Sequence, residues 1–167
     1  MNGKVIGIFL AALAVIGAAG MWYLQVFHYY DRVQPTGFVL QTESGARPAG
    51  ATGIEAIDAA SSPIRFRACF DTTLAPDVEA IPYEDAVPLN APFWFDCFDA
   101  ADIGAKLADG SARAFLGEKN VAFGTDRIVA ITDAGRGYVW HQLNDCGELA
   151  YDGTQIGEDC PPREDFE

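Results

Sequence analysis

The sequence predicts an α+β protein in which one N-terminal transmembrane helix is followed by a small antiparallel-sheet domain with one short helix. Three observations predict this class: an uncharged apolar run near the N-terminus, several short β-type segments separated by turn residues, and one segment with helix start and stop signals. The predicted organisation is an anchor at residues 1–30, a linker with a short strand at 31–53, a folded domain at 54–157 and an acidic tail at 158–167.

The first thirty residues predict a retained membrane anchor. From Val5 to Leu24 there are 20 residues without a charged or strongly polar side chain. A helix of that length spans roughly 30 Å, the thickness of the hydrocarbon core of a bilayer. A cleaved signal peptide is the alternative, with Ala18-Ala19-Gly20 as its cleavage site. A retained anchor is favoured because Lys4 is the only basic residue before the run, and the run exceeds a usual signal-peptide core.

Charge and aromatic residues predict how the anchor is oriented. Lys4 is the only charged side chain before Asp31, and a strongly acidic region follows. The positive-inside rule therefore places the N-terminus in the cytoplasm and the domain outside. Aromatic residues, with His28 among them, crowd the outer end of the run, where amphipathic rings suit the headgroup zone. The predicted interface belt consists of Trp22, Tyr23, Phe27, Tyr29 and Tyr30.

One face of the anchor is lined by small residues, which recur at spacings of four, four, three and four and so share one stripe of a helix. A small stripe lets another transmembrane helix approach closely, so integral membrane proteins are the expected partners. The alternative is that glycine and alanine are simply common in membrane spans. The predicted packing face consists of Gly3, Gly7, Ala11, Ala14 and Ala18.

The region after the anchor predicts short strands around one helix. Asp99 is a helix N-cap candidate, Ile103 and Leu107 follow four residues apart, and Gly110 ends the segment. Pro82, Pro88 and Pro92 make residues 81–95 an extended, ordered loop, and Pro161-Pro162 keep the acidic tail from being helical. Strands are expected at residues 38–42, 64–70, 112–116, 127–133, 138–143 and 148–151, with turns at 124–126 and 133–137.

All four cysteines lie after the anchor, which predicts two disulfides in an oxidising compartment. Four cysteines allow three connectivities. Cys69–Cys97 with Cys146–Cys160 is preferred, because short loops pair locally and Cys160 would otherwise leave the tail loose. A bridge that closes a loop of about 15 residues stabilises by about 3 kcal/mol on a chain-entropy argument.

Charge and motifs exclude several function classes. The 24 acidic and 11 basic residues give a net charge of −13, which disfavours nucleic-acid binding and favours basic partners. No cofactor or metal is expected: there is no C-x-x-C spacing, and His141 lies in a strand-like segment typical of packed residues. Phosphate-binding glycine loops and G-x-S-x-G elbows are absent from the sequence, so a non-enzymatic role is expected.

Several strings together resemble a known group of proteins. They are Met1-Asn2-Gly3-Lys4, Tyr23-Leu24-Gln25-Val26, residues 61–70 (SSPIRFRACF), 94–100 (WFDCFDA) and 137–142 (GYVWHQ). They resemble an uncharacterised family of short membrane-anchored proteins from Rhodobacter-type alphaproteobacteria, and the resemblance covers nearly the whole chain. Automatic labels for that family sometimes read "histidine kinase", but this sequence has no dimerisation helix pair and no ATP-binding glycine motif. The resemblance implies a bacterial inner-membrane protein with a periplasmic domain and brings no catalytic residues.

Two functional hypotheses follow. The first is a non-catalytic accessory subunit of an inner-membrane respiratory complex, with an aa3-type cytochrome c oxidase or its bc1 supercomplex as the preferred host; its acidic domain would attract a basic cytochrome c. The second is a periplasmic assembly or quality-control factor, or a sensor domain, with Phe93-Trp94-Phe95 as its binding surface. The alternative for these three aromatics is that they fill the core of the domain.

Overall fold

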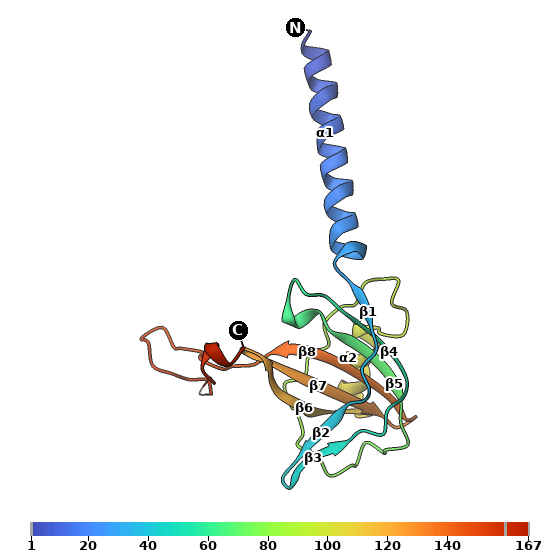
Figure 1. Ribbon diagram of the computed structural model, residues 1–167, viewed down its shortest axis with the longest axis vertical. Coiled ribbons are helices and arrows are strands. Elements are labelled where there is room, and N and C mark those ends of the chain that lie inside the picture. The colour runs from blue at the N-terminus through green and yellow to red at the C-terminus, as the bar shows by residue number, and fades with distance from the viewer. Residues whose placement is uncertain (1, 159, 167) are drawn as a thin grey trace.

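The computed structural model describes residues 2–158 and 160–166, and it has the predicted α+β architecture (Figure 1). Helix α1 (Gly3–Tyr23) and the π-helical turn η1 (Leu24–His28) extend away from a domain of antiparallel strands. Met1 of the predicted anchor and Asp159 and Glu167 of the predicted tail lie outside the described residues.

The domain is built on a six-stranded antiparallel sheet with the order β1-β4-β5-β8-β7-β6, accompanied by the two-stranded sheet β2-β3. The strands are β1 (Asp31–Val33), β2 (Val39–Thr42), β3 (Gly45–Pro48), β4 (Thr52–Asp58), β5 (Arg67–Asp71), β6 (Ala112–Ala122), β7 (Thr125–Thr132) and β8 (Arg136–Leu143).

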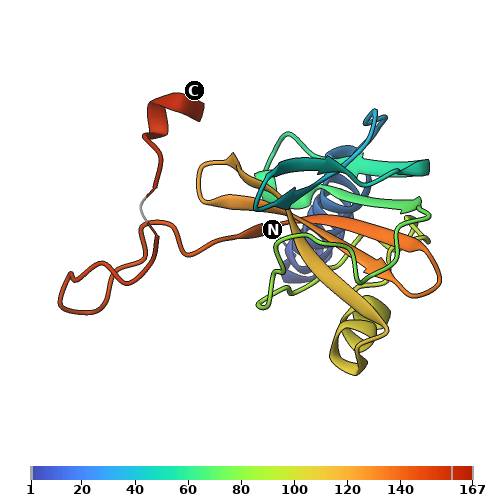
Figure 2. The same cartoon turned by 90° about the horizontal axis from the view of Figure 1, so that it is seen from below.

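Both faces of the large sheet are covered, which explains why its central strands are apolar on both sides. Along β8, Val139 packs into one hydrophobic cluster, whereas Tyr138 and Trp140 pack into the other, as the two-residue period of a strand requires. The first cluster includes Leu40 of β2, and the second includes Ile103 of helix α2 (Ala100–Asp109). The β2–β3 hairpin and α2 accordingly lie on opposite sides of the sheet (Figure 2).

Helix α2 begins and ends at the predicted residues. The Asp99 carboxylate accepts hydrogen bonds from the backbone N–H groups of Ala101 (2.9 Å) and Asp102 (3.2 Å), which are among the unpaired donors of the first turn. Gly110 ends the helix in the left-handed conformation, with φ 83°. Ile103 is fully buried, so the apolar face of the helix packs onto the sheet.

Residues 31–53 belong to the folded domain, and the linker predicted there is wrong. β1 pairs with β4, with Asp31 opposite Asp58, and the strand expected at 38–42 is present as β2, paired with β3. Phe38 and Leu40 are buried in the core. Two of the glycines that suggested a linker, Gly45 and Gly53, lie within β3 and β4, and both have a positive φ (125° and 59°), which glycine adopts without strain.

The strand predicted at 64–70 begins later and is buried on both faces. Pro63–Arg65 form the 3-10 turn η2, and β5 starts at Arg67, which the alternation had placed at a half-buried surface. Arg67 is buried among backbone carbonyls: its guanidinium donates to Leu89 O (2.7 Å) and to Ile64 O (2.8 Å), and also to the carbonyls of Phe66 and Asn90. Burial lowers the pKa of Arg67 to about 10, so the side chain stays charged at neutral pH.

The other strand predictions were partly right. The strands expected at 112–116, 127–133 and 138–143 are present as β6, β7 and β8 with shifted ends. The turn expected at 124–126 is shorter, because Thr125 and Asp126 are fully buried residues of β7. The strand expected at 148–151 is wrong: Leu149 makes only an isolated bridge to Gln155.

The segment 81–95 is the extended, ordered loop that its prolines predict, and it covers the edge of β6. Tyr83 N donates to Ala114 O (2.9 Å), and Leu116 N donates to Ile81 O (2.9 Å). This pairing occupies backbone groups that an edge strand would otherwise expose.

Candidate functional site

Helix α1 lies outside its own domain. It has no buried residue, and a Cβ added at Gly3 or Gly7 would meet nothing within 4 Å. Together with η1 it forms a 26-residue helix, Gly3–His28, which is long and apolar enough to cross a membrane. The predicted packing face, including Ala11, Ala14 and Ala18, is therefore open along its length. Among the described residues, nothing in the chain itself covers this face.

The predicted aromatic belt contacts the domain. Phe27 is the centre of the contact: its ring lies 5.4 Å from the ring of Trp22, 5.9 Å from Tyr23 and 6.4 Å from Trp94. Tyr30 lies edge-on to Trp94 at 6.1 Å. Tyr29 stands apart from this cluster, because its ring contact is with His28.

Trp94 joins the domain to the end of the N-terminal helix. Its indole Nε1 donates a 2.7 Å hydrogen bond to the carbonyl oxygen of Val26 in η1. The last carbonyls of a helix have no partner within the helix, so this bond satisfies one of them. The sequence offered Trp94 as a binding surface or as core. The structure makes it the connection between anchor and domain, which only knowledge of the distant Val26 carbonyl could have indicated.

The four cysteines form the two preferred disulfides. Cys69 on β5 pairs with Cys97, which fixes the loop that precedes α2, and their Cα atoms are 6.2 Å apart. Cys146 pairs with Cys160 at a Cα distance of 5.0 Å. The second bridge lies in a C-terminal lobe, residues 144–158 and 160–166, which projects from the sheet in both Figure 1 and Figure 2.

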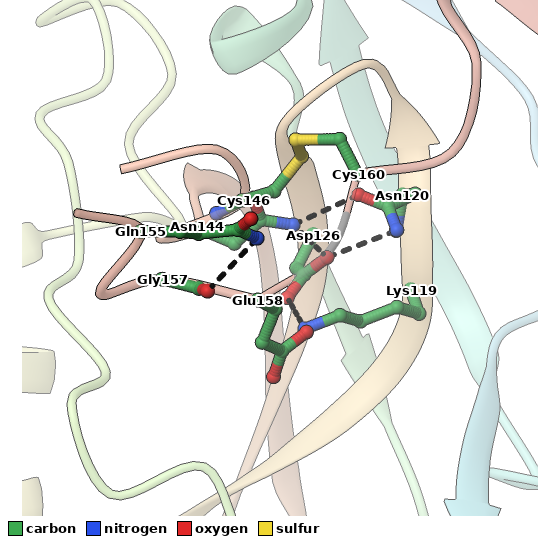
Figure 3. The surroundings of a disulfide bond; sticks show 9 residues. All are labelled: Lys119, Asn120, Asp126, Asn144, Cys146, Gln155, Gly157, Glu158 and Cys160. Atoms are coloured by element: carbon green, nitrogen blue, oxygen red, sulfur yellow. Dashed lines mark hydrogen bonds and ion pairs between the residues drawn. A yellow bond between two sulfur atoms is a disulfide. The ribbon is translucent and has the colours of Figure 1, made fainter. Parts of the chain in front are cut away.

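The C-terminal lobe is attached to β6 and β7 through a buried carboxylate. Asp126 is fully buried, and its Oδ1 accepts hydrogen bonds from Asn120 N (2.9 Å) and Asn144 Nδ2 (2.7 Å). Lys119 Nζ lies 3.2 Å from Asp126 Oδ2 and 2.6 Å from Glu158 Oε2 (Figure 3). The burial of Asp126 could not be recognised from the sequence, because the string Gly124-Thr125-Asp126 is typical of a turn.

The end of the chain also packs on the domain, which corrects the tail prediction. Residues Arg163–Phe166 form the 3-10 turn η3. The Phe166 ring lies 6.2 Å from the ring of Phe123, and the Arg163 guanidinium lies 4.4 Å from the same ring. The preceding prolines do not prevent this turn, because proline is tolerated ahead of or within the first turn of a helix.

An acidic groove lies between the lobe and the loop that covers β6. Lys119 and Tyr83 lie among its acidic residues. The pKa of Tyr83 is raised, first by burial and then by the nearby Asp126 carboxylate. A groove of this charge attracts basic side chains electrostatically. Its acidic residues come from three separate segments and are Glu84, Asp85, Asp145, Glu148 and Glu158.

His141 is a packed strand residue, as its context suggested. It is 7% exposed, and its ring stacks on Phe66 at 4.7 Å. Arg127 Nε donates to His141 Nε2 (3.1 Å), and Nδ1 donates to the carbonyl oxygen of Pro63 (2.7 Å). Burial, together with a smaller effect of the nearby Arg127 charge, lowers the pKa of His141 to about 4, so the ring is neutral at pH 7. Among residues 2–158 and 160–166, no group of three or more His, Cys, Asp or Glu side chains is placed to hold a metal ion.

These features define a class: a disulfide-bonded α+β domain joined to an N-terminal helix that can span a membrane. Residues 37–161 match the profile of a family described as a family of unknown function (DUF6446), and the chain belongs to that family. The match begins within the segment expected to be a linker, in agreement with the burial of Phe38 and Leu40. No curated protein and no solved structure gives a significant match.

Proposed function

We propose that this protein is a non-catalytic, single-span accessory subunit of a bacterial inner-membrane complex. The observation that carries the proposal is the position of α1, which lies outside its own domain with an open small-residue face. A helix of this kind has its whole surface available for lipid and for other transmembrane helices. The connection through Trp94 would transmit that docking to the domain, since it fixes the helix end to the loop before α2.

The proposed topology has the N-terminus in the cytoplasm and the domain in the periplasm. Two disulfides support it, because such bonds persist in oxidising compartments. Lys4 at the start of α1 supports the same orientation.

The proposed host is a respiratory complex, an aa3-type cytochrome c oxidase or its bc1 supercomplex. The acidic groove supports this choice, since a basic cytochrome c would be drawn to a membrane surface that presents clustered carboxylates. If so, binding of a basic cytochrome c to the purified chain should weaken with rising salt and with Asp85→Lys. The alternative of an assembly factor or sensor has less support, because Trp94 and Phe95 of its candidate surface are used inside the molecule.

Purification from native membranes in mild detergent tests the proposal. The wild-type chain should co-migrate at a fixed ratio with a larger haem-containing complex. Ala14→Leu, which fills the small face, should release it, whereas the same change at Ala12, on the other side of the helix, should not. Migration of the wild-type chain as a free monomer would refute the subunit role, and recovery only with immature complexes would favour the assembly factor.

A further inference from the structure

Phe93 is an aromatic side chain left outside both hydrophobic clusters. It is 69% exposed, whereas its neighbour Phe95 is 3% exposed. The turn that presents it is closed by a hydrogen bond from Phe95 N to Pro92 O (2.9 Å). An exposed phenylalanine at the tip of an ordered turn forgoes the transfer free energy that burial of its ring would gain. The groups that surround Phe93 therefore indicate whether its exposure has a function.

Phe93 lies against the end of the anchor. Its ring is edge-on to the ring of Phe27, with centroids 5.8 Å apart. Phe27 also contacts Trp22 and Tyr23, at the point where the apolar run of α1 ends. Phe93 thus extends the aromatic belt sideways, from the helix onto the domain.

The loop that carries Phe93 cannot easily move away from this position. Trp94 is bonded to the Val26 carbonyl, Phe95 is anchored in the core, and Cys97 is joined to Cys69 of β5. The ring of Phe93 is consequently held at a fixed position relative to the helix end.

Two arginines lie at the same end of the domain. The Arg32 guanidinium lies 5.8 Å from the ring of Trp94, and the Arg65 guanidinium lies 5.4 Å from the ring of Tyr30. Guanidinium groups bind phosphate oxygens well, and aromatic rings partition into the interface of a bilayer. In a chain of net charge −13, cations stacked on the membrane-side aromatics complement lipid headgroups.

We propose that the Phe93 turn is a second membrane contact, which rests in the phospholipid headgroup layer beside the anchor and holds the domain in a fixed orientation on the bilayer. The inference rests on the proposed membrane span but not on any partner protein. It differs from a simple tether, in which the domain would rotate freely below the helix.

Nitroxide labelling of the full chain in vesicles of phosphatidylcholine and phosphatidylglycerol tests this contact. A label on Phe93→Cys should be readily relaxed by oxygen and shielded severalfold from a water-soluble nickel chelate. The control is Ser44→Cys, in the β2–β3 turn at the end of the domain away from α1 (Figure 1), and its label should show the reverse. Equal exposure of both labels to the chelate would overturn the contact.

Two further measurements distinguish loss of the Phe93 contact from loss of the membrane span and from damage to the disulfides. Co-flotation with the vesicles reports the span itself: a chain that floats while the label at 93 remains in water refutes only the Phe93 contact. Because an added thiol can disturb the native disulfides, benzoylphenylalanine is placed at residue 93 or 44 in a second pair of chains. A phospholipid photo-adduct at 93 and none at 44 supports the contact, and equal yields at both positions contradict it.

Discussion

Acidification should destabilise the domain through His141. The neutral ring is required by its partners: Nε2 accepts a hydrogen bond from Arg127, so it has no free lone pair for a proton, and Nδ1 donates to the Pro63 carbonyl. Protonation in the folded state would break the Arg127 bond and place two cations together in a buried site next to Phe66. Unfolding removes this constraint, because the exposed imidazole takes up its proton at the ordinary pKa.

The sign and size of the effect follow from the two pKa values. Burial lowers the pKa of His141 from 6.5 to about 4 in the folded protein. Below pH 6.5 the unfolded chain therefore binds a proton that the folded chain does not. The free energy of unfolding decreases as the pH is lowered, and the decrease levels off below about pH 4, where the folded form is protonated as well. Between about pH 7.5 and pH 4.5 the loss from this one group is about 2.5 kcal/mol.

Urea unfolding of the full chain in detergent, with disulfides intact, measures the loss at the two pH values. The carboxylates also titrate in this range, so the comparison is between variants. His141→Gln removes the titrating ring and should show about 2.5 kcal/mol less pH dependence than the wild type. His28→Gln, at the exposed second histidine, should retain the wild-type dependence. Identical slopes for His141→Gln and the wild type would refute the reasoning.

Three other changes test how the domain is held together. Arg67→Lys should lower the free energy of unfolding by about 3 kcal/mol in the same assay, because an ammonium cannot reach all four carbonyls; a loss within error would contradict that role. Gly137→Ala should cost about 1–3 kcal/mol, since the added Cβ would overlap the Phe70 ring, and an unchanged melting temperature would argue against this packing. Replacing Cys146 and Cys160 by serine should open the C-terminal lobe to protease while the sheet remains resistant; equal protection of the lobe would show that the bridge is not needed.

Local signals in the sequence were sufficient for some elements. The N-cap at Asp99 and the left-handed Gly110 define α2, because both act on backbone groups one to three residues away. The strands around Val129 and Val139 are apolar enough to be recognised by composition. β4, in contrast, was missed: Gly53 and its acidic residues are poor strand formers, and its pairing with β1 and β5 depends on residues far away in the chain.

The candidate sites show the same division. The apolar run, its stripe of small residues and the aromatic residues at its end are patterns of nearby residues, and they can be recognised in the sequence alone. The role of Trp94 depends on the carbonyl of Val26, and the burial of Asp126 depends on Asn144 and Lys119.

The sequence by itself therefore determined a helix long and apolar enough to span a membrane, a mainly antiparallel domain and an even set of cysteines. Only the tertiary structure decided that the segment after the anchor is part of the sheet, that an arginine is buried among carbonyls, and that a tryptophan joins the domain to the helix. The physical reason is that hydrogen bonds and burial between distant segments depend on where the folded chain brings them together, and short-range patterns do not record those positions.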